Sequence, residues 1–391
     1  MLVSHIEMQN WRNFKSAKAD LREVTYVLGP NASGKSNFLD CFRFLRDIAK
    51  SNGGGLQKAV TARGALKKVR CLHARSKPEV GIIVEVCDDI TPERPSWRYE
   101  LFFNSEGKGR QRPIVASEKV VRFDENGQRR VLLNRPDAED NKDVERLTQT
   151  ALEQIQANLE FRPLAEFLAN TTYVHLVPQL LKYADEIGGR KLEDDPFGQG
   201  FLERLARTPD GTRRSRLKRI EVALKSVIPQ IEKLEFVKDA ITGLPHLEAR
   251  YKHHRPRGAI QREDQFSDGT LRLISLFWLI MEGQSLLLLE EPELSLNEEI
   301  VGRLPALIAR VQKGMRRRRQ IIITTHSAAL LSNAGISGDS LLILVPSDEG
   351  TSIDHTTEAE DTALASGFSP AEVVLPRAQN PVTGRQLELR L

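Results

Sequence analysis

Residues 29–36 are Gly29-Pro30-Asn31-Ala32-Ser33-Gly34-Lys35-Ser36, which matches the phosphate-binding pattern G-x-x-x-x-G-K-[ST]. The apolar stretch Val24–Leu28 before it predicts a buried strand, and apolar residues at helical spacing over residues 37–48 predict a helix after it. The pattern requires this strand–loop–helix context, because backbone N–H groups and the helix N-terminus then face a bound phosphate. A glycine-containing turn with an incidental lysine is the alternative, which the flanking strand and helix disfavour.

Two side chains of this loop have expected chemical roles. The ammonium of Lys35 would reach the β- and γ-phosphates of a nucleotide, and the hydroxyl of Ser36 would ligate Mg²⁺. The sequence therefore predicts a nucleoside triphosphate, ATP, bound with magnesium.

A second candidate element lies some 250 residues later, where Leu286–Leu289 is followed by Glu290-Glu291-Pro292-Glu293. Four apolar residues that end in acids predict a core strand whose C-terminal end presents carboxylates, and ligands of parallel sheets bind at that end. One acid would hold Mg²⁺ and the next would polarise the attacking water. A solvated acidic loop is the alternative for the segment taken alone.

Two shorter segments add candidate contacts to the γ-phosphate. Thr324-Thr325-His326-Ser327 follows another core strand at Ile321–Thr324, although a lone histidine there is more often structural than catalytic. Phe266-Ser267-Asp268-Gly269-Thr270 precedes a helix predicted over residues 267–282, with Ser267 or Asp268 as its N-cap. A helix start of this kind is also suited to phosphate.

The four elements in this order resemble the ABC-type ATPase heads of SMC, RecF and OLD proteins. The sequence looks most similar to small bacterial AAA-family ATPases of the OLD/RecF-like group, which occur in phage-defence or toxin-like operons. Trp11-Arg12-Asn13-Phe14 is similar to the aromatic-Arg segment that lies near the nucleotide in this group.

The resemblance implies a role for each matching residue. Glu290 would ligate Mg²⁺ as the Walker B acid, Glu291 would be the general base, and His326 would be the switch histidine. The resemblance also implies catalytic participation of Lys35, and Gln179 is the candidate Q-loop ligand of Mg²⁺. The implied nucleotide contacts are Arg12, Gly29, Pro30, Asn31, Ala32, Ser33, Gly34, Lys35, Ser36 and Asn37, with Ser267 and Gly269 touching ATP held by a second protomer.

Two positions depart from the family pattern. Walker B usually has aspartate where this chain has Glu290, and the signature Leu-Ser-Gly-Gly-Gln is here Phe-Ser-Asp-Gly-Thr, from Phe266. We find no heptad run for a coiled-coil arm, which argues against a full SMC protein. The chain after His326 is too short for the Toprim nuclease domain of OLD proteins, so we expect any nuclease to be a separate chain.

The expected fold is α/β, a P-loop NTPase of the ABC-ATPase head type, in which a mixed sheet core carries an antiparallel β lobe and a helical insertion. Short strands with turn signals predict the lobe as a meander, and the predicted helices are Leu147–Leu168, Gly200–Val227 and Asn297–Gln312. The expected segments are 1–50 with 236–346 as the ATPase core, 51–144 as the lobe, 145–235 as the helical insertion and 347–391 as a polar C-terminal tail.

Composition narrows the class of protein. The 391 residues are 40% hydrophobic and 28% charged, which is enough for a large core and excludes global disorder. Apolar stretches fall far short of the roughly 20 residues of a membrane span, so no membrane partner is expected. The N-terminus lacks the features of a signal peptide, and the three scattered cysteines form no C-x-x-C pair. We therefore expect a cytoplasmic protein.

The expected activity is ATP hydrolysis by a homodimer or higher homo-oligomer that forms around ATP and controls a separately encoded effector. The alternative is a DNA-engaging ATPase of repair or recombination. The net charge of +4 leaves DNA contact to local patches, and residues 213–219 and 316–319 are basic runs with that potential. A solvated helix face and a polar turn explain these runs equally well. A transporter subunit is disfavoured by the signature sequence and the β meander.

Overall fold

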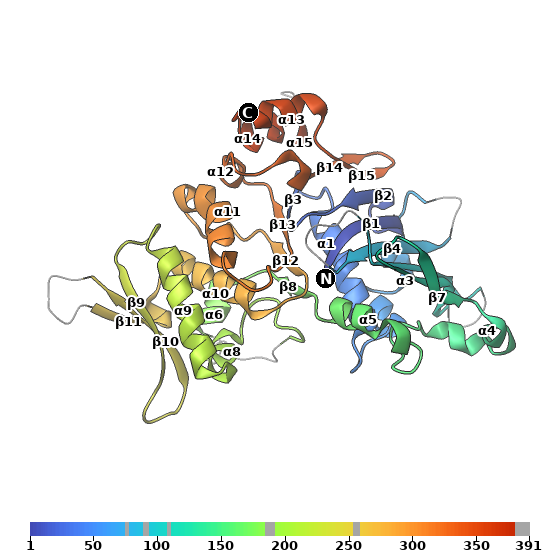
Figure 1. Ribbon diagram of the computed structural model, residues 1–391, viewed down its shortest axis with the longest axis horizontal. Coiled ribbons are helices and arrows are strands. Elements are labelled where there is room, and N and C mark those ends of the chain that lie inside the picture. Colours follow the sequence, from blue (N-terminus) through green and yellow to red (C-terminus); the bar gives the residue numbers. More distant parts are fainter. Residues whose placement is uncertain (75–77, 89–93, 108–110, 184–191, 253–258, 380–391) are drawn as a thin grey trace, which may run out of the picture. The chain divides into compact units, whose positions relative to one another are not determined.

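The computed structural model describes residues 1–74, 78–88, 94–107, 111–183, 192–252 and 259–379 (Figure 1). The chain divides into two compact units: the first comprises Met1–Asn170 with Thr324–Leu391, and the second comprises Thr171–Ile323. The P-loop segment and the expected β lobe therefore belong to the same unit, whereas the acidic strand and the signature segment belong to the other.

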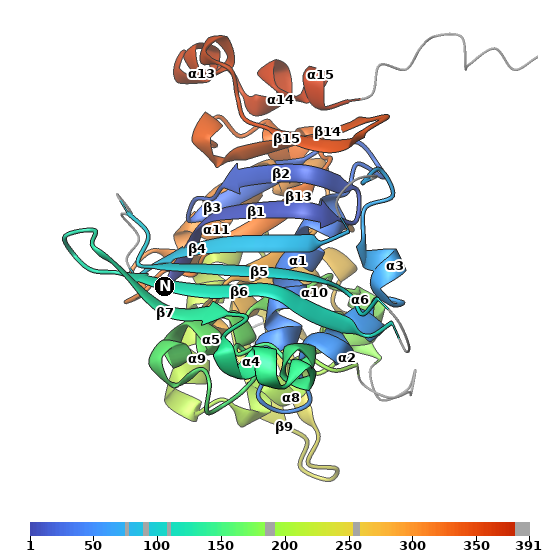
Figure 2. The same ribbon diagram turned by 90° about the vertical axis from the view of Figure 1, so that its right-hand side faces the viewer.

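An antiparallel sheet forms the larger β layer of the first unit (Figure 2). Its strands lie in the order β2-β1-β4-β5-β6-β7, and β4 to β7 form the expected meander. The N-terminal strands β1 and β2 extend the same sheet through antiparallel pairing of β1 with β4. The bounds are β1 (Leu2–Trp11), β2 (Phe14–Asp20), β4 (Val80–Cys87), β5 (Trp97–Ser105), β6 (Pro113–Phe123) and β7 (Arg129–Arg135).

The P-loop segment joins a strand of a second, mixed sheet to a helix. Strand β3 (Val24–Leu28) pairs in parallel with β14 (Leu341–Ser347), and β14 pairs in antiparallel fashion with β15 (Gly350–Asp354). Helix α1 (Lys35–Ala49) follows the loop. The strand, loop and helix expected around residues 29–36 are thus confirmed.

Aromatic packing holds α1 against the antiparallel sheet. The Phe44 ring lies 5.0 Å from the ring of Trp11 in β1 and 5.3 Å from that of Phe103 in β5, centroid to centroid. All three side chains are fully buried. The other helices of the sequence up to residue 170 are α2 (Leu56–Thr61), α3 (Leu66–Val69), α4 (Ala138–Lys142), η1 (Val144–Thr148), η2 (Leu159–Phe161) and α5 (Arg162–Ala169).

The prediction of one long helix over residues 147–168 is wrong. The chain forms only the short turns η1 and η2 before α5, whose first turn contains Pro163. Between these turns, the backbone N–H groups of Ala151 and Leu152 donate to the buried carboxylate of Glu118, at 2.7 and 3.1 Å. A helix would direct those N–H groups elsewhere, so a contact from distant β6 opposes the local helical pattern.

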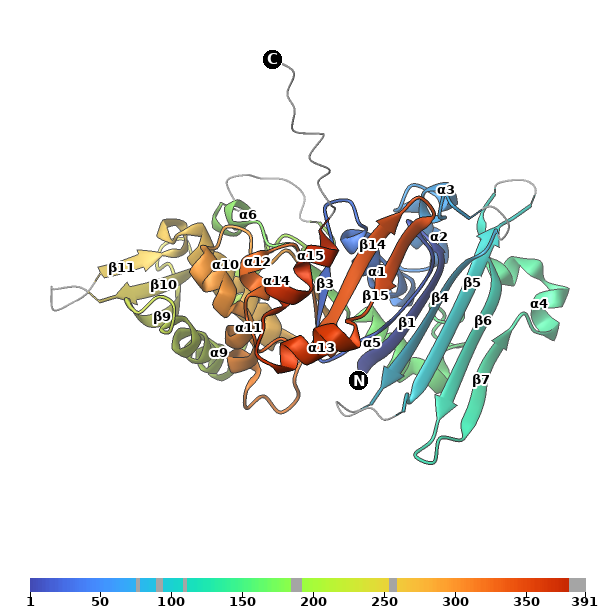
Figure 3. The same cartoon turned by 90° about the horizontal axis from the view of Figure 1, so that it is seen from above.

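The second unit contains a parallel pair and a small antiparallel sheet (Figures 1 and 3). Strand β12 pairs in parallel with β8, and the N–H of Leu287 in β12 donates to the carbonyl of Gln320, just before β13. Strands β9, β10 and β11 form the antiparallel sheet. The bounds are β8 (Thr172–Val174), β9 (Ile231–Lys238), β10 (Pro245–Tyr251), β11 (Ala259–Arg262), β12 (Leu287–Glu290) and β13 (Ile321–Thr325), which crosses the division between the units.

Two of the predicted helices of the second unit are confirmed and one is corrected. Ser267 caps α10 and Asn297 caps α11, close to the expected starts. The helix expected over residues 200–227 is instead two helices, because Pro209 ends the first and starts the second. The bounds are α6 (Pro178–Lys182), α8 (Phe201–Arg207), α9 (Asp210–Leu224), η3 (Glu263–Gln265), α10 (Asp268–Glu282) and α11 (Glu298–Gln312).

The segment expected to be a polar C-terminal tail from residue 347 contains regular secondary structure. Strand β15 completes a hairpin with β14, and three short helices follow. Residues 380–391 lie outside the described residues. Within the described chain, no helix has the length and apolar character needed to cross a bilayer. The remaining helices of the first unit are α12 (Ala328–Leu331), η4 (Gly338–Ser340), α13 (Glu358–Ala365), α14 (Pro370–Val373) and α15 (Leu375–Ala378).

Candidate functional site

The loop between β3 and α1 requires its two glycines for space. A Cβ on Gly29 would lie 2.5 Å from Ser33 Oγ, and a Cβ on Gly34 would lie 2.1 Å from Asn13 Nδ2. Gly34 also has a φ of +100°, which residues other than glycine rarely adopt. The spacing of the two glycines in the motif is therefore what allows the chain to curl back tightly before α1.

Lys35 is positioned by the loop that it follows. Its side chain is buried, and Nζ donates to the carbonyl oxygens of Gly29 at 2.9 Å and Pro30 at 3.0 Å. These bonds hold the ammonium against the first residues of the loop. The predicted phosphate lysine is thus fixed by contacts to backbone atoms of its own motif.

A contact from outside the motif ties the loop to two other segments. Asn13 Nδ2 donates to Ser33 O at 2.9 Å and to Thr351 Oγ1 at 2.6 Å, and Thr351 Oγ1 donates to the same carbonyl at 3.0 Å. Asn37 Nδ2 donates to Asn13 Oδ1 at 2.8 Å. Asn13 and Thr351 were missed as site residues from sequence, although Asn13 belongs to the quoted aromatic-Arg segment.

Arg12, the predicted nucleotide contact, binds one acid and one carbonyl of its own unit. Its Nη2 donates to Asp40 Oδ2 at 2.9 Å, and Nη1 donates to Lys68 O at 3.0 Å. Arg63 also binds Asp40 and in addition pairs with Asp47 at 2.9 Å. Burial by itself would raise the pKa of Asp40, but the charges and hydrogen bonds of Arg63 and Arg12 outweigh it and lower the pKa.

Two observations on the P-loop fit a phosphate ligand. The N-cap residue of α1 is Gly34, which has no side chain to cap the helix that begins at Lys35. Ser33 Oγ is buried and has no hydrogen-bond partner within the described chain. Backbone N–H groups of a helix start, a buried hydroxyl and a lysine ammonium together are the donor set that phosphate oxygens need.

In the second unit, Glu290 is the last residue of β12, as the pattern predicts. Tyr173 in β8 donates its hydroxyl to Glu290 Oε2, and His175 Nδ1 lies 3.2 Å from the carbonyl oxygen of Glu290. Parallel pairing of β8 with β12 brings these side chains to the strand end. Tyr173 was missed because its strand is only three residues long and has no clear pattern.

The chain turns sharply after the strand. Glu291 has a φ of +44°. The buried guanidinium of Arg272, on α10, donates to the carbonyls of Leu294 in this turn and of Leu176 before α6. Burial lowers the pKa of Arg272. A lone arginine within the apolar helix 268–282 was the available sequence signal, because a buried charge needs polar partners.

The N-terminus of α10 lies beside the same turn. A Cβ on Gly269 would come within 2.9 Å of Ser295 O, so glycine allows this close approach. Ser267 Oγ accepts from the N–H of Thr270 as the N-cap. Asp268 receives the Gln179 amide at 3.1 Å and the Lys182 ammonium at 2.7 Å.

The second unit thus contains the acidic turn, the signature segment and the Q-loop candidate, linked by Arg272 and Asp268. Gln179 Nε2 donates to Asp268 of the signature segment, so the Gln179 side chain lies beside the first residue of α10. Its role as a metal ligand stays a prediction.

His326 follows β13 in the part of the chain assigned to the first unit, and its side chain is exposed. Ser327 next to it caps α12 by accepting from the N–H of Leu330. Across the described residues, no cluster of three or more His, Cys, Asp or Glu side chains is arranged to hold a metal. Magnesium sites of nucleotide enzymes need fewer protein ligands, because substrate phosphates complete them.

Comparison with known proteins gives a family. The family described as "AAA domain, putative AbiEii toxin, Type IV TA system" matches residues 24–332. No curated protein matches the chain.

Two solved structures are similar. The SMC head domain from Thermotoga maritima has 13% identity and a TM-score of 0.47, over 91% of this chain and 100% of that chain. The Smc head domain with an extended coiled coil bound to the C-terminal domain of ScpA, from Pyrococcus furiosus, has 10% identity and a TM-score of 0.48, over 93% of this chain and 98% of that chain. The α/β P-loop ATPase fold with a mixed sheet is confirmed by the family match and the element order.

Proposed function

The chain belongs to the AAA-domain family described as putative AbiEii toxin of a Type IV TA system, and on this basis we propose that it is a switch that binds and hydrolyses ATP. The observation that carries the proposal is the P-loop, in which Lys35 is held on the carbonyls of Gly29 and Pro30 at the start of α1. This donor set suits a triphosphate, and its burial would strengthen each charge-assisted contact.

The proposed roles follow the motifs. Residues 29–37 would bind the phosphates, Ser36 and Glu290 would hold Mg²⁺ with Gln179 as a further candidate, and Arg12 is a candidate nucleotide contact. Mg²⁺ neutralises phosphate charge as it develops in the transition state. Tyr173 would orient the Glu290 carboxylate through its hydroxyl.

Hydrolysis needs a water aligned with the γ-phosphate and a group that takes its proton. We propose that Glu291 is this general base, since it follows the metal-binding acid directly and the turn holds it in a left-handed backbone conformation. Lys35 would stabilise charge on the γ-phosphate, and His326 would sense its presence.

The proposed output is a change of assembly. Ser267 and Gly269 at the start of α10 would contact ATP bound by a second copy, so ATP would link two protomers and hydrolysis would release them. The toxin–antitoxin description of the family supports control of a separately encoded effector, and the OLD-like assignment and a role in phage defence are part of this proposal.

The cysteines Cys41, Cys71 and Cys87 are buried without a disulfide in the described chain, which fits the cytoplasm.

A second candidate function is DNA engagement, as in repair ATPases. The observation that favours it is the gathering of arginines in one cavity of the second unit. In that case the ATP switch would be the same, and its output would be a change in the affinity for nucleic acid.

The test combines mass and turnover in Glu291→Gln, which keeps the size of the side chain but removes the base. We expect nucleotide binding to persist, turnover to fall by a factor of about 10²–10⁴, and light scattering to report a dimer with Mg-ATP and a monomer without it. Turnover equal to wild type would contradict the role of Glu291. A monomer in both conditions would contradict the roles of Ser267 and Gly269.

A further inference from the structure

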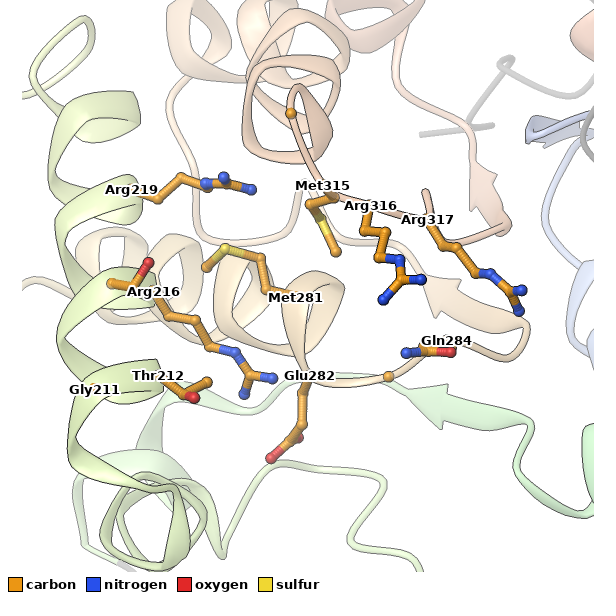
Figure 4. A pocket seen from close by; sticks show the side chains of 13 residues that line it. Gly211, Thr212, Arg216, Arg219, Met281, Glu282, Gln284, Met315, Arg316 and Arg317 are labelled. Atoms are coloured by element: carbon orange, nitrogen blue, oxygen red, sulfur yellow. The ribbon is translucent and has the colours of Figure 1, made fainter.

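A cavity of about 750 Å³ lies in the second unit, between α9, the C-terminal end of α10 and the turn between α11 and β13 (Figure 4). All of its lining residues fall between positions 211 and 317, so the second unit forms it alone. The two basic runs, about a hundred residues apart in sequence, both contribute to it. Among the described residues, its arginines are Arg216, Arg219, Arg316 and Arg317.

Two arginines of the runs have structural contacts and do not line the cavity. Arg213 stacks on Phe236, with 4.0 Å from its guanidinium carbon to the ring centroid, and binds carbonyls that include Thr208 O. Arg319 is buried and donates to Ser285 O at 2.7 Å and Leu279 O at 2.6 Å. These two explain why part of each run is basic without any ligand.

The arginines of the cavity are poorly matched by acids. Glu282 is the carboxylate that lines it, and Glu282 is shared with Arg204 at 3.2 Å. Within the described chain, neither Arg316 nor Arg317 has an ion-pair or hydrogen-bond partner, and both are exposed. An excess of cations around one concave space attracts anions and costs free energy through mutual repulsion when none is bound.

Arg216 shows the same imbalance in a partly buried position. Its guanidinium carbon lies 5.1 Å from the centroid of the Trp278 ring, and its side chain extends toward Glu282 (Figure 4). Burial lowers the pKa of Arg216, and the charge of Glu282 only partly offsets this. The close-up also shows Arg316 pointing into the space beside Gln284.

We propose that this cavity is a second phosphate site, separate from the P-loop, that binds a nucleotide either free or as part of a nucleic-acid strand. Arginine forms bidentate bonds to phosphate oxygens, and groups from two elements could hold one phosphate from two sides. The thioethers of Met281 and Met315 lie between the arginines and give an apolar surface for a base (Figure 4). The volume lies within the roughly 300–1,000 Å³ of small-ligand sites.

An acidic peptide is the competing ligand, because carboxylates also pair with arginine. The combination of an apolar floor with guanidinium groups favours a nucleotide, since a base stacks on guanidinium planes and an aspartate or glutamate side chain offers no such surface.

The test measures binding of a short fluorescein-labelled single-stranded oligonucleotide to the full chain by anisotropy, over a series of salt concentrations and without Mg-ATP. We expect Arg316→Gln to weaken binding about tenfold and to lower the slope of log affinity against log salt by about one. Arg216→Gln is expected to act in the same direction. Arg216 also packs on Trp278. Weaker binding by Arg216→Gln therefore counts as loss of a ligand contact when the variant unfolds at the wild-type temperature.

The matched control is Arg214→Gln, which removes the same charge from an exposed position on α9 outside the cavity. Its affinity should equal that of wild type. Equal weakening by Arg214→Gln and Arg316→Gln would overturn the proposal, because bulk charge would then explain binding. Absence of oligonucleotide binding at low salt, together with equal affinity of wild type and Arg316→Gln for adenosine monophosphate, would overturn it as well.

Competition distinguishes the sources of the phosphate. Displacement of the oligonucleotide by adenosine monophosphate supports a free nucleotide, and resistance to it supports a strand. Displacement by polyglutamate as effective as by a strand of equal charge would overturn the nucleotide assignment. ATP turnover of Arg316→Gln should stay at the wild-type rate, so the outcome here is independent of the proposed ATPase switch.

Discussion

The P-loop of the first unit and the acidic turn of the second are held in different ways. In the P-loop, the lysine is held by contacts that are short-range in sequence, because Lys35 Nζ donates to the carbonyls of Gly29 and Pro30. In the acidic turn, a buried arginine from another helix, Arg272, binds the carbonyls of Leu294 and Leu176. The position of Lys35 is thus encoded locally, although Asn13 and Thr351 add tertiary contacts to the loop, whereas the acidic turn is held by a tertiary contact from Arg272.

This difference predicts which variants separate binding from stability. Substitutions in the P-loop should weaken nucleotide binding and leave the stability of the fold unchanged. Substitutions at Arg272 should lower the stability of the second unit and also reduce turnover. The predictions below test this separation in order of expected size.

The largest effect is expected from Lys35→Ala. Loss of the ammonium should weaken ATP binding by roughly a hundredfold or more, because a buried charge-assisted contact to phosphate disappears. Titration calorimetry measures it, and the control is Lys15→Ala, an exposed lysine that pairs with Glu349. Unchanged ATP affinity in Lys35→Ala would refute the P-loop assignment.

The next effect is expected from Arg272→Met. Removing the guanidinium leaves the carbonyls of Leu176 and Leu294 without their donor, which should lower the free energy of unfolding by about 3 kcal/mol. Urea denaturation measures it, and turnover should fall as the turn of Glu291 loosens. A variant as stable as wild type would show that the turn is held by other contacts.

A smaller effect is expected from Asn13→Ala, which tests the tertiary part of the P-loop. The loss of the hydrogen bond to Ser33 O should lower the free energy of unfolding by about 1–2 kcal/mol and weaken ATP binding about tenfold. Thr351→Val removes the second donor to the same carbonyl and should have a smaller effect, because the Asn13 amide still donates to it. If both variants bind ATP like wild type, contacts within the motif are enough to hold the loop. The P-loop would then differ more strongly from the acidic turn, which needs Arg272.

The smallest effect is expected from Asp40→Asn, at about 1 kcal/mol at neutral pH, since Arg63 keeps its pair with Asp47. The pKa of Asp40 is lowered in the fold, so its stabilisation is complete above the usual aspartate range and is lost as the pH falls through the lowered pKa. Wild type and variant should therefore converge in stability in acid, as followed by thermal melts at a series of pH values. A stability difference that persists in acid would contradict this account.

Several expectations held because they rest on local patterns. The P-loop, the cap at Ser267 and the position of Glu290 at the end of β12 depend on residue types within a few positions. Expectations failed where distant residues compete with local preference. Glu118 of β6 accepts hydrogen bonds from the N–H groups of residues 151 and 152, which disrupts the expected helix there, and β15, in the segment expected to be a polar tail, pairs with β14.

The linear order of residues was enough to predict the P-loop ATPase fold, because glycine spacing, a lysine and a preceding apolar strand act through adjacent backbone. It could not show that Asn13 and Thr351 meet at one carbonyl, that Arg272 supports the turn of Glu291, or that Arg216 and Arg316 line one cavity. These contacts join residues from dozens to hundreds of positions apart. Only the packing of strands and helices brings such residues within hydrogen-bonding distance or around one space, because side chains that share no local element have no fixed separation until the core forms.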